Sequence, residues 1–513
     1  MQFTRYFSFA LTVVAALGAQ TMFPATSAAQ RTPAAMSAIR QADIRSDMDA
    51  LAGDEMRGRE AGTLDEMRAS MWLAEQMRKI GLTPHGDAGS WFQWFNMRRT
   101  RISTTTSSVK SGGRTLALWT EITPVSNTAG DVAGATIFIG DGSDTTVDIR
   151  GRIVVATLVA PPPASVRTTT NTYEVNYTRA AVASISNRLT RRGASAIILI
   201  ADSIAEMAFD GVAKTQIRGA YDVVGGVPRF VRQPVTGTAA APTPPPTPVP
   251  VLLAHRQMLP DLRAPGQTVD IRLRSESFET PSVNIIGVVA GTDPKLRDEY
   301  VVFSSHQDHD GVRYTVAGDS IWNGADDNGS TSVALLAIAR AWIKQPSRRS
   351  ALFIFHGAEE KGLLGSRYHV AHPVVPLSQI AAVLNGDMIG RNHPDTAALL
   401  GSQPPHRNSS DLVRIAMEAN RATGKFVIDS LWDRPTHPEG WYFRSDHVPY
   451  AERSVPSIFF STNLHSDYHT PRDEPKNIDY SKLTRMTQWV YMTGWIAANA
   501  AKRPAIDAGF VLR

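Results

Sequence analysis

Four short segments between residues 300 and 390 carry side chains that could bind a metal ion. They read SSHQDHDG at 304–311, GADDNGS at 324–330, GAEEKG at 357–362 and NGDM at 385–388. Zinc accepts imidazole nitrogens and carboxylate oxygens, and a catalytic zinc site keeps one position open for water. Two such ions about 3.5–4 Å apart can clamp an attacking water and polarise a carbonyl. Several ligand types recurring together therefore predict a hydrolytic metal site.

Apolar runs precede three of these segments and indicate how they are positioned. The runs are Val301–Phe303, Ala351–Phe355 and Ile380–Leu384, and a helix pattern over Asn328–Lys344 lies between the first two. Such alternation predicts βαβ units and a parallel sheet. Ligands bind at the carboxyl ends of the strands in sheets of this kind. We expect an α/β fold with a mixed, mostly parallel central sheet flanked by helices.

The chain outside this region divides into parts of different character. Further helix patterns cover Leu64–Ile80, which Gly81 ends, Ser410–Thr423 and Leu483–Ala500, and strand patterns cover Asn284–Val289 and Pro456–Phe460. Residues 125–275 instead contain short β-rich runs without a cluster of metal ligands: Ala135–Ile139, Arg152–Leu158, Ala196–Ile200 and Val249–Ala254. We expect a catalytic domain formed by residues 30–125 and 275–513, with a small β-rich domain inserted at 126–274.

Composition narrows the chemistry and the location. The 513 residues carry a net charge of +5 without a basic block, so we expect no nucleic-acid partner. The chain has no cysteine, which excludes a thiolate site and a cysteine nucleophile. Arg5, the apolar run Phe7–Gly18 and the small residues Ser27–Ala29 predict a cleaved signal peptide at 1–29. We expect a periplasmic or secreted protein without a membrane anchor, and the sequence predicts no particular oligomeric state.

Five motifs occur in an order that is found in one known family. They are H-x-D at 306–308, GADDNGS at 324–330, AEE at 358–360, NGDM at 385–388 and DYHTP at 467–471. Together they resemble the co-catalytic di-zinc exopeptidases, which include bacterial zinc aminopeptidases, glutamate carboxypeptidase II and the inactive transferrin receptor. The resemblance covers about residues 30–125 and 275–500. The runs Asp148–Ala156 and Gly193–Ile200 resemble the protease-associated domain, which implies a cover over the active-site entrance.

The resemblance implies a set of two zinc ions and their ligands. His306 and Asp387 bind one zinc, Glu360 and His469 bind the other, and Asp327 bridges the two. It also implies a cis peptide bond after the bridging Asp327.

Three further residues take catalytic or supporting roles by the same resemblance. Glu359 is the general base, which deprotonates the attacking water held by the metals and then protonates the leaving amine. Asp308 is not itself a ligand and orients the imidazole of His306. Tyr468 hydrogen-bonds the developing oxyanion.

Two of these positions have neighbouring competitors. Asp327 is preferred to Asp326 because it directly precedes Asn-Gly-Ser, and His469 is preferred to His465 because of its Asp-Tyr-His-Thr-Pro context. We leave His309, His356 and His447 out of the site, because a lone histidine is more often structural than a ligand.

The expected function is removal of N-terminal residues from peptide substrates by an exported zinc exopeptidase. A glutamate carboxypeptidase-like enzyme is the second reading, and it requires a basic patch for the substrate carboxylate. A glutaminyl cyclase-like transferase with a single zinc is the third. A non-catalytic receptor-like protein is the fourth, although such a protein is expected to have lost ligands that are present here. A serine hydrolase could use Ser445, Asp446 and His447, but no G-x-S-x-G motif accompanies them.

Overall fold

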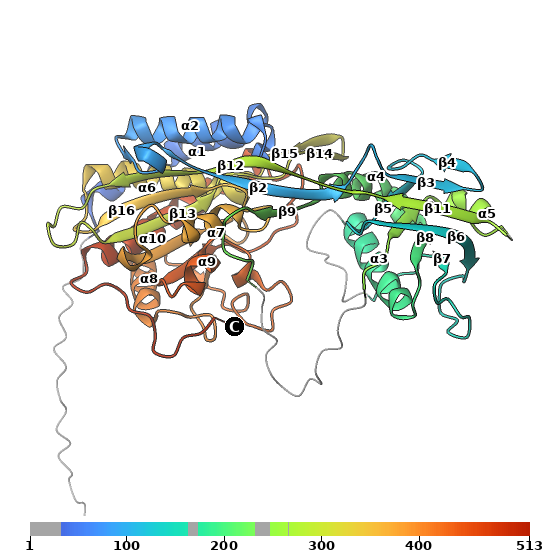
Figure 1. Ribbon diagram of the computed structural model, residues 1–513. Helices are drawn as coiled ribbons and strands as arrows, with labels where there is room; N and C mark the ends of the chain where they lie inside the picture. The colour runs from blue at the N-terminus through green and yellow to red at the C-terminus, as the bar shows by residue number, and fades with distance from the viewer. Residues whose placement is uncertain (1–31, 163–172, 231–246, 265, 513) are drawn as a thin grey trace, which may run out of the picture.

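A computed structural model describes residues 32–162, 173–230, 247–264 and 266–512 (Figure 1). The predicted signal peptide at 1–29 lies outside the described residues. Within those ranges, no helix is both long and apolar enough to cross a membrane. Two large sheets organise the described residues, and a pair of long strands connects them. A third sheet has two strands, β14 Gly311–Val316 and β15 Asp319–Trp322.

The larger sheet has ten strands, and its central strands are parallel. Their order is β19-β18-β20-β17-β13-β16-β12-β2-β9, with β1 paired to β12. β16, β13, β17 and β20 run parallel, whereas β12, β2, β9 and β18 join antiparallel on either side. The mixed α/β sheet is as predicted, with its parallel part confined mainly to the centre. The strands are β1 Thr83–Pro84, β2 Phe92–Ile102, β9 Ala220–Val223, β12 Ser275–Val289, β13 Tyr300–His306, β16 Ser350–His356, β17 Ile380–Gly386, β18 Thr396–Leu400, β19 Val427–Ile428 and β20 Ser457–Ser461.

Helices cover both faces of this sheet because its strands are apolar on both sides. Phe303 of β13 points into one buried cluster and Val302 into another, as expected from the alternation of side chains along a strand. The first cluster packs against α1 Gln41–Ala52, α2 Leu64–Ile80, α6 Thr331–Lys344, α8 Ser410–Ala422 and α10 Tyr480–Asn499. The second packs against α7 Leu364–Ala371 and α9 His447–Glu452.

The second sheet has eight strands and is accompanied by two substantial helices. Its order is β4-β3-β11-β6-β7-β8-β10-β5. The helices α3 Tyr173–Arg191 and α4 Ser203–Arg218 make this part more helical than the β-rich prediction. The strands are β3 Ser108–Ser111, β4 Arg114–Leu116, β5 Ile122–Pro124, β6 Gly130–Phe138, β7 Ile153–Thr157, β8 Ala196–Ile200, β10 Val251–Ala254 and β11 Thr268–Leu273, and the short α5 Leu259–Leu262 precedes β11.

The two sheets share the chain differently from the predicted boundaries. β3, β4 and β5 already belong to the second sheet, so the predicted boundary at residue 126 falls inside it. β9 lies within the range predicted for the insert but pairs with β2 of the large sheet. The long antiparallel pair β2 and β12 runs from the large sheet toward the second one (Figure 1). The sequence did not indicate this pair, because the arginine-rich second half of β2 lacks a continuous apolar pattern.

Most of the predicted elements near the site are found within a few residues. The helix predicted at Leu64–Ile80 is confirmed, and Gly81 ends it in the left-handed conformation. The strand predicted at Asn284–Val289 is the second half of the longer β12. The helix predicted from Asn328 begins at Thr331, because a separate helical turn, Ala325–Ser330, precedes it.

Candidate metal centre

The candidate ligands meet at one edge of the large sheet. His306 is the last residue of β13, the Glu359–Glu360 pair follows β16, and Asp387 follows β17. Asp327 lies in the helical turn before α6, and His469 lies in the loop after β20. Because β13, β16, β17 and β20 are parallel, their carboxyl ends converge as the sequence predicted.

One group of ligand atoms surrounds His306. His306 Nε2 lies 3.3 Å from Asp327 Oδ1, 3.5 Å from Asp387 Oδ2 and 3.8 Å from Glu359 Oε2. All four side chains are buried. Ser445 Oγ donates a 2.8 Å hydrogen bond to Asp387 Oδ2 and fixes the orientation of that carboxylate.

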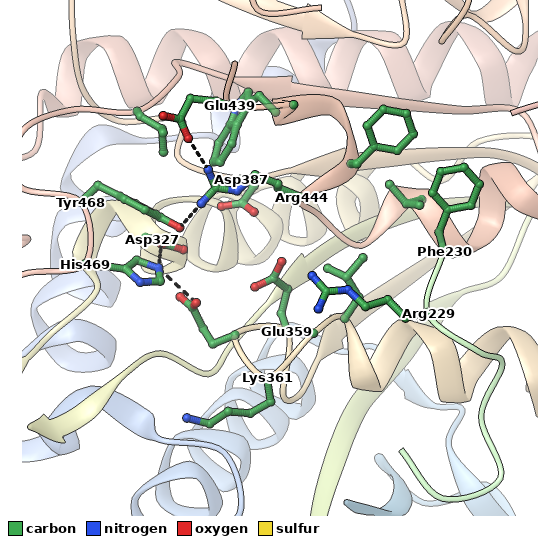
Figure 2. A pocket seen from close by; sticks show the side chains of 18 of the residues that line it. Arg229, Phe230, Asp327, Glu359, Lys361, Asp387, Glu439, Arg444, Tyr468 and His469 are labelled. Carbon is green, nitrogen blue, oxygen red and sulfur yellow. Dashed lines mark hydrogen bonds and ion pairs between the residues drawn. The ribbon is translucent and has the colours of Figure 1, made fainter. Parts of the chain in front are cut away.

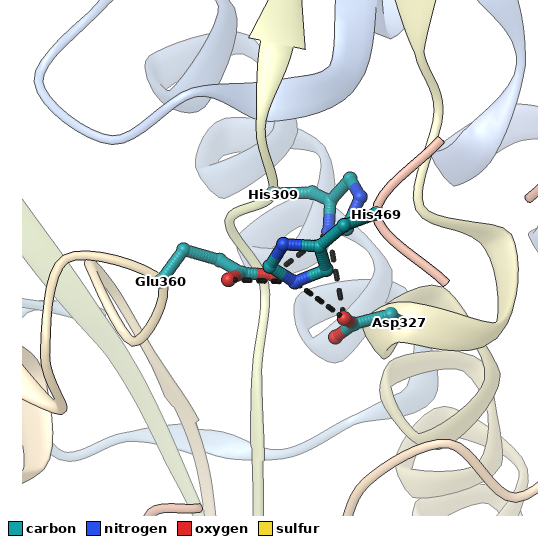
Figure 3. A group of neighbouring side chains, drawn as sticks. All are labelled: His309, Asp327, Glu360 and His469. Atoms are coloured by element: carbon teal, nitrogen blue, oxygen red, sulfur yellow. Dashed lines mark ion pairs between the residues drawn. The ribbon is translucent and has the colours of Figure 1, made fainter. Parts of the chain in front are cut away.

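A second group surrounds His469 (Figure 3). His469 Nε2 lies 3.1 Å from Asp327 Oδ2 and 3.1 Å from Glu360 Oε2. His309, which the sequence analysis left out, also faces this group, with Nδ1 2.9 Å from Glu360 Oε1. The sequence placed His309 in the same short segment as His306, and that shared segment was the one signal that could have identified it.

Asp327 is common to both groups. Its Oδ1 faces His306 and its Oδ2 faces His469, the arrangement that a bridging carboxylate requires. Asp473 accepts a 3.0 Å hydrogen bond from the backbone N–H of Asp327, and the peptide bond to Asn328 is cis, as the resemblance implied. The carboxylate of Asp326, the other candidate for the bridging position, faces His465.

Asp326 and His465 form a separate pair. His465 Nε2 lies 3.3 Å from Asp326 Oδ2, and the backbone N–H of Gly390 donates a 2.6 Å hydrogen bond to Asp326 Oδ1. Neither side chain joins the two groups. The structure therefore separates Asp326 and His465 from Asp327 and His469.

Asp308 supports both ligand-bearing loops. Its backbone carbonyl oxygen lies 3.1 Å from His306 Nδ1, whereas its carboxylate Oδ1 is 3.8 Å from that nitrogen. The carboxylate accepts hydrogen bonds from the backbone N–H groups of Glu359 and Glu360 at 3.0 and 3.4 Å. Asp308 thus contacts His306 mainly through its backbone, and its side chain positions the glutamate pair.

Two further residues stabilise the segments that carry the candidate ligands, and neither was predicted from the sequence. Asp310 Oδ2 lies 3.3 Å from His469 Nδ1, so His469 can face Asp310 and the ligand group at once. Arg59 is completely buried and donates hydrogen bonds to the carbonyl oxygens of Gln307, Asn323 and Gly324. It therefore ties the loop after β13 to the turn that carries Asp327.

The electrostatics of the site fit bound cations. Burial raises the pKa of Glu359 well above its usual range, and burial raises the pKa of Asp387 to about 6. Burial acts on Glu360 in the same direction, but the imidazoles of His469 and His309 outweigh it and hold the pKa of Glu360 well below its usual range. Gathering four carboxylates in a buried site is costly unless positive charge compensates them.

Buried polar atoms without hydrogen bonds also indicate a site for cations. Several buried nitrogen and oxygen atoms have no hydrogen-bond partner among the described residues: His306 Nε2, His309 Nδ1 and Nε2, Glu360 Oε1, Asp387 Oδ1 and His469 Nε2. Buried polar atoms are nearly always paired, so a concentration of unpaired donors and acceptors indicates a site that binds a ligand. The imidazole and carboxylate set is one that zinc accepts.

A cavity of about 740 Å³ opens beside these groups. Figure 2 shows Asp327, Glu359, Asp387 and His469 at its wall. The ring of Tyr468 lies beside that of His469, with centroids 3.9 Å apart and ring planes tilted by 34°. Arg444 donates a 2.8 Å hydrogen bond to Tyr468 Oη, which leaves the phenolic proton of Tyr468 available to another acceptor.

Both sheets contribute to the wall of this cavity. Val175 and Thr215 belong to α3 and α4, whereas Trp441 and Tyr468 belong to the part built on the large sheet. The cavity therefore lies where the two parts of the molecule meet.

The sequence is similar to known aminopeptidases. Aminopeptidase YwaD of Bacillus subtilis (strain 168) is 29% identical over 253 residues, which cover 48% of this chain and 51% of that protein. Probable leucine aminopeptidase 2 of Aspergillus oryzae is 32% identical over 216 residues, 40% of this chain and 39% of that protein. The chain thus spans about half or less of the length of these relatives.

Solved structures share the fold over nearly the whole chain. An aminopeptidase from Aneurinibacillus sp. strain AM-1 matches with a TM-score of 0.53 and 17% identity, covering 93% of this chain and 97% of that one. A zinc aminopeptidase from Bacillus subtilis matches with a TM-score of 0.52 and 19% identity, covering 92% and 99%. The model of peptidase family M28 matches residues 284–493, which carry all the candidate ligands. Through this region, the chain is similar to peptidase family M28.

Proposed function

We propose that this protein is a zinc-dependent aminopeptidase that binds two zinc ions. The observation that carries the proposal is the position of Asp327, whose two carboxylate oxygens face two separate His and carboxylate groups. Similarity to proteins named aminopeptidases supports the choice of reaction. Export from the cytoplasm is also proposed, from the pattern in residues 1–29 alone.

The chain's own residues supply the proton transfers. Zinc bound at this centre would polarise the scissile carbonyl and acidify the attacking water. Glu359 faces the cavity beside His306, and its raised pKa suits a carboxylate that takes a proton from water and passes it to the leaving amine. Tyr468, held by Arg444, is placed to donate its phenolic proton to the oxygen that gains charge.

A carboxypeptidase is the second candidate, because the cavity wall is rich in cations. These residues are Arg179, Arg229, Arg313, Lys361, Arg367 and Arg444. Several already pair with carboxylates: Arg313 with Asp310, Lys361 with Glu60 and Arg444 with Glu439. Those pairs offset part of the positive charge, which favours the aminopeptidase over a site for a substrate carboxylate.

A paired substrate panel tests the choice. One set carries a free amino terminus with varied first residues, and the other carries a blocked amino terminus and a free carboxylate. Each is assayed as purified, after chelation and after zinc is restored. Zinc-dependent cleavage of the free-amine set is the expected result. Cleavage of the blocked set alone establishes the carboxypeptidase, and zinc binding without either cleavage rejects both.

A further inference from the structure

His309 is a buried histidine whose ring nitrogens have no hydrogen-bond partner in the part of the chain that the structure describes. Its side chain is completely buried, and neither Nδ1 nor Nε2 makes a hydrogen bond to any described residue. The 2.9 Å approach of Nδ1 to Glu360 Oε1 is an ion-pair distance without hydrogen-bond geometry. An imidazole left in this state is costly, so something else is expected to bind it.

A backbone hydrogen bond and the space beside Gly324 define the position of His309. The backbone N–H of His309 donates a 3.3 Å hydrogen bond to the carbonyl oxygen of Arg59. The ring lies against Gly324, where an added Cβ atom would be 2.3 Å from His309 Cγ. Gly324 also has a φ of +62°, which a side chain would rarely adopt. Gly324 thus leaves room for the imidazole in one fixed position.

The donor atoms around this position are spaced as ligands of one ion. One atom from each of His309, Asp327, Glu360 and His469 lies within 4.8 Å of all the others (Figure 3). Zinc bonds of about 2.0–2.2 Å in a tetrahedron place neighbouring donors about 3.3–3.6 Å apart. The distances of 2.9, 3.1, 3.1 and 4.0 Å here bracket that spacing.

We propose that His309 is a fourth protein ligand in the His469 group. This inference rests on the proposed zinc-dependent function and concerns residues that the family resemblance did not include. The His469 group then has four protein ligands, as in zinc sites that are closed to water. The His306 group would then have three protein ligands, His306, Asp387 and Asp327, and would leave a position for water beside Glu359. The two positions consequently differ in affinity, with the His469 group holding zinc more tightly.

The alternative is that His309 only donates a hydrogen bond to Glu360. His309→Asn separates the two roles, because an asparagine amide nitrogen stands close to the place of Nδ1 and can donate, but is not a zinc ligand. His465→Asn is the matched control, since His465 is also buried but pairs with Asp326 outside both groups.

Zinc affinities of the full chain are measured by competition with a chromophoric chelator. His309→Asn is expected to weaken the tighter site by more than about 100-fold, because loss of an outer partner alone costs about 10–100-fold. His465→Asn is expected to leave that site within about tenfold of the parent protein. A loss in His309→Asn of 100-fold or less overturns the ligand role.

X-ray absorption of the zinc-loaded parent protein gives a second readout that does not depend on folding of the variant. The expected spectrum corresponds to three imidazole ligands in total for the bound zinc ions, from His306, His309 and His469. A spectrum with two imidazoles rejects His309 as a ligand and leaves the proposed function standing. A parent protein that binds no zinc rejects both the ligand and the proposed function.

Discussion

At the scale of the residue, Glu359 is distinguished from the other carboxylates of the site by its surroundings. It faces the cavity and lies 3.8 Å from His306, farther than Asp327 or Asp387. Glu359→Gln is expected to retain zinc but to lower kcat by about 10²–10⁴-fold, since glutamine cannot accept the proton. Metal analysis and steady-state kinetics check this, with Glu452→Gln in the cavity wall as a control of near-normal activity. Near-normal turnover of Glu359→Gln would exclude it as the base.

The neighbouring carboxylates Asp327 and Asp326 are also expected to differ in their roles. Asp327→Ala removes a donor from both groups at once and is expected to lose zinc from both. Asp326→Ala breaks the contact with His465 and is expected to lower thermal stability while zinc remains bound. Zinc content by mass spectrometry and the Tm compare the two variants. Full zinc content in Asp327→Ala would show that another residue bridges.

At the scale of the element, the end of α4 reaches the outer layer of the metal centre. Arg218, the last residue of α4, donates hydrogen bonds of 2.9 Å to Glu60 Oε2 and 2.7 Å to the carbonyl oxygen of Asp310. The Asp310 carboxylate in turn faces His469 Nδ1 at 3.3 Å. Glu60 also pairs with Lys361, which directly follows Glu360. A helix of the second sheet therefore supports the loops that carry two of the proposed ligands.

Arg218→Ala is consequently expected to weaken zinc binding at the His469 group by about tenfold or more. Lys214→Ala is the matched control, because Lys214 lies one turn earlier on α4 and pairs, among the described residues, with the exposed Asp210. Zinc titrations of both variants, with the Tm measured in parallel, separate an effect on the ligands from a general loss of stability. Equal zinc affinities in the two variants would show that Arg218 does not affect zinc binding at the His469 group.

The elements show which parts of the site were predictable. The runs before His306, Glu359 and Asp387 are local patterns, and parallel strands must bring their ends together, so the core of the site followed from the sequence. Arg218 could not be recognised in this way, and His309 could be recognised only through the segment that it shares with His306. Their roles depend on Gly324 leaving space for a ring and on α4 ending beside Asp310, which are contacts between distant segments.

At the scale of the whole molecule, the second sheet and its helices form part of the cavity rather than a separate body. Figure 1 shows α3 and α4 beside the ends of the long strands β2 and β12, and Thr215 of α4 lines the same cavity as Glu359. A cavity of about 740 Å³ is larger than the space one side chain fills, and Thr215 is part of its wall, so we expect a longer peptide to extend along α4. The second part of the molecule is therefore expected to limit substrate length.

Thr215→Trp tests this limit by filling the α4 side of the cavity. Forcing atoms into occupied space costs about 1–3 kcal/mol, which corresponds to roughly 5–150-fold in kcat/KM for peptides long enough to reach Thr215. Single-residue anilides remain near the metal groups and are expected to react at nearly the parent rate. Met207→Trp is the control, because Met207 is 70% exposed on the same helix and is not part of the cavity wall. Equal effects of Thr215→Trp on short and long substrates would show that peptides leave the site by another side.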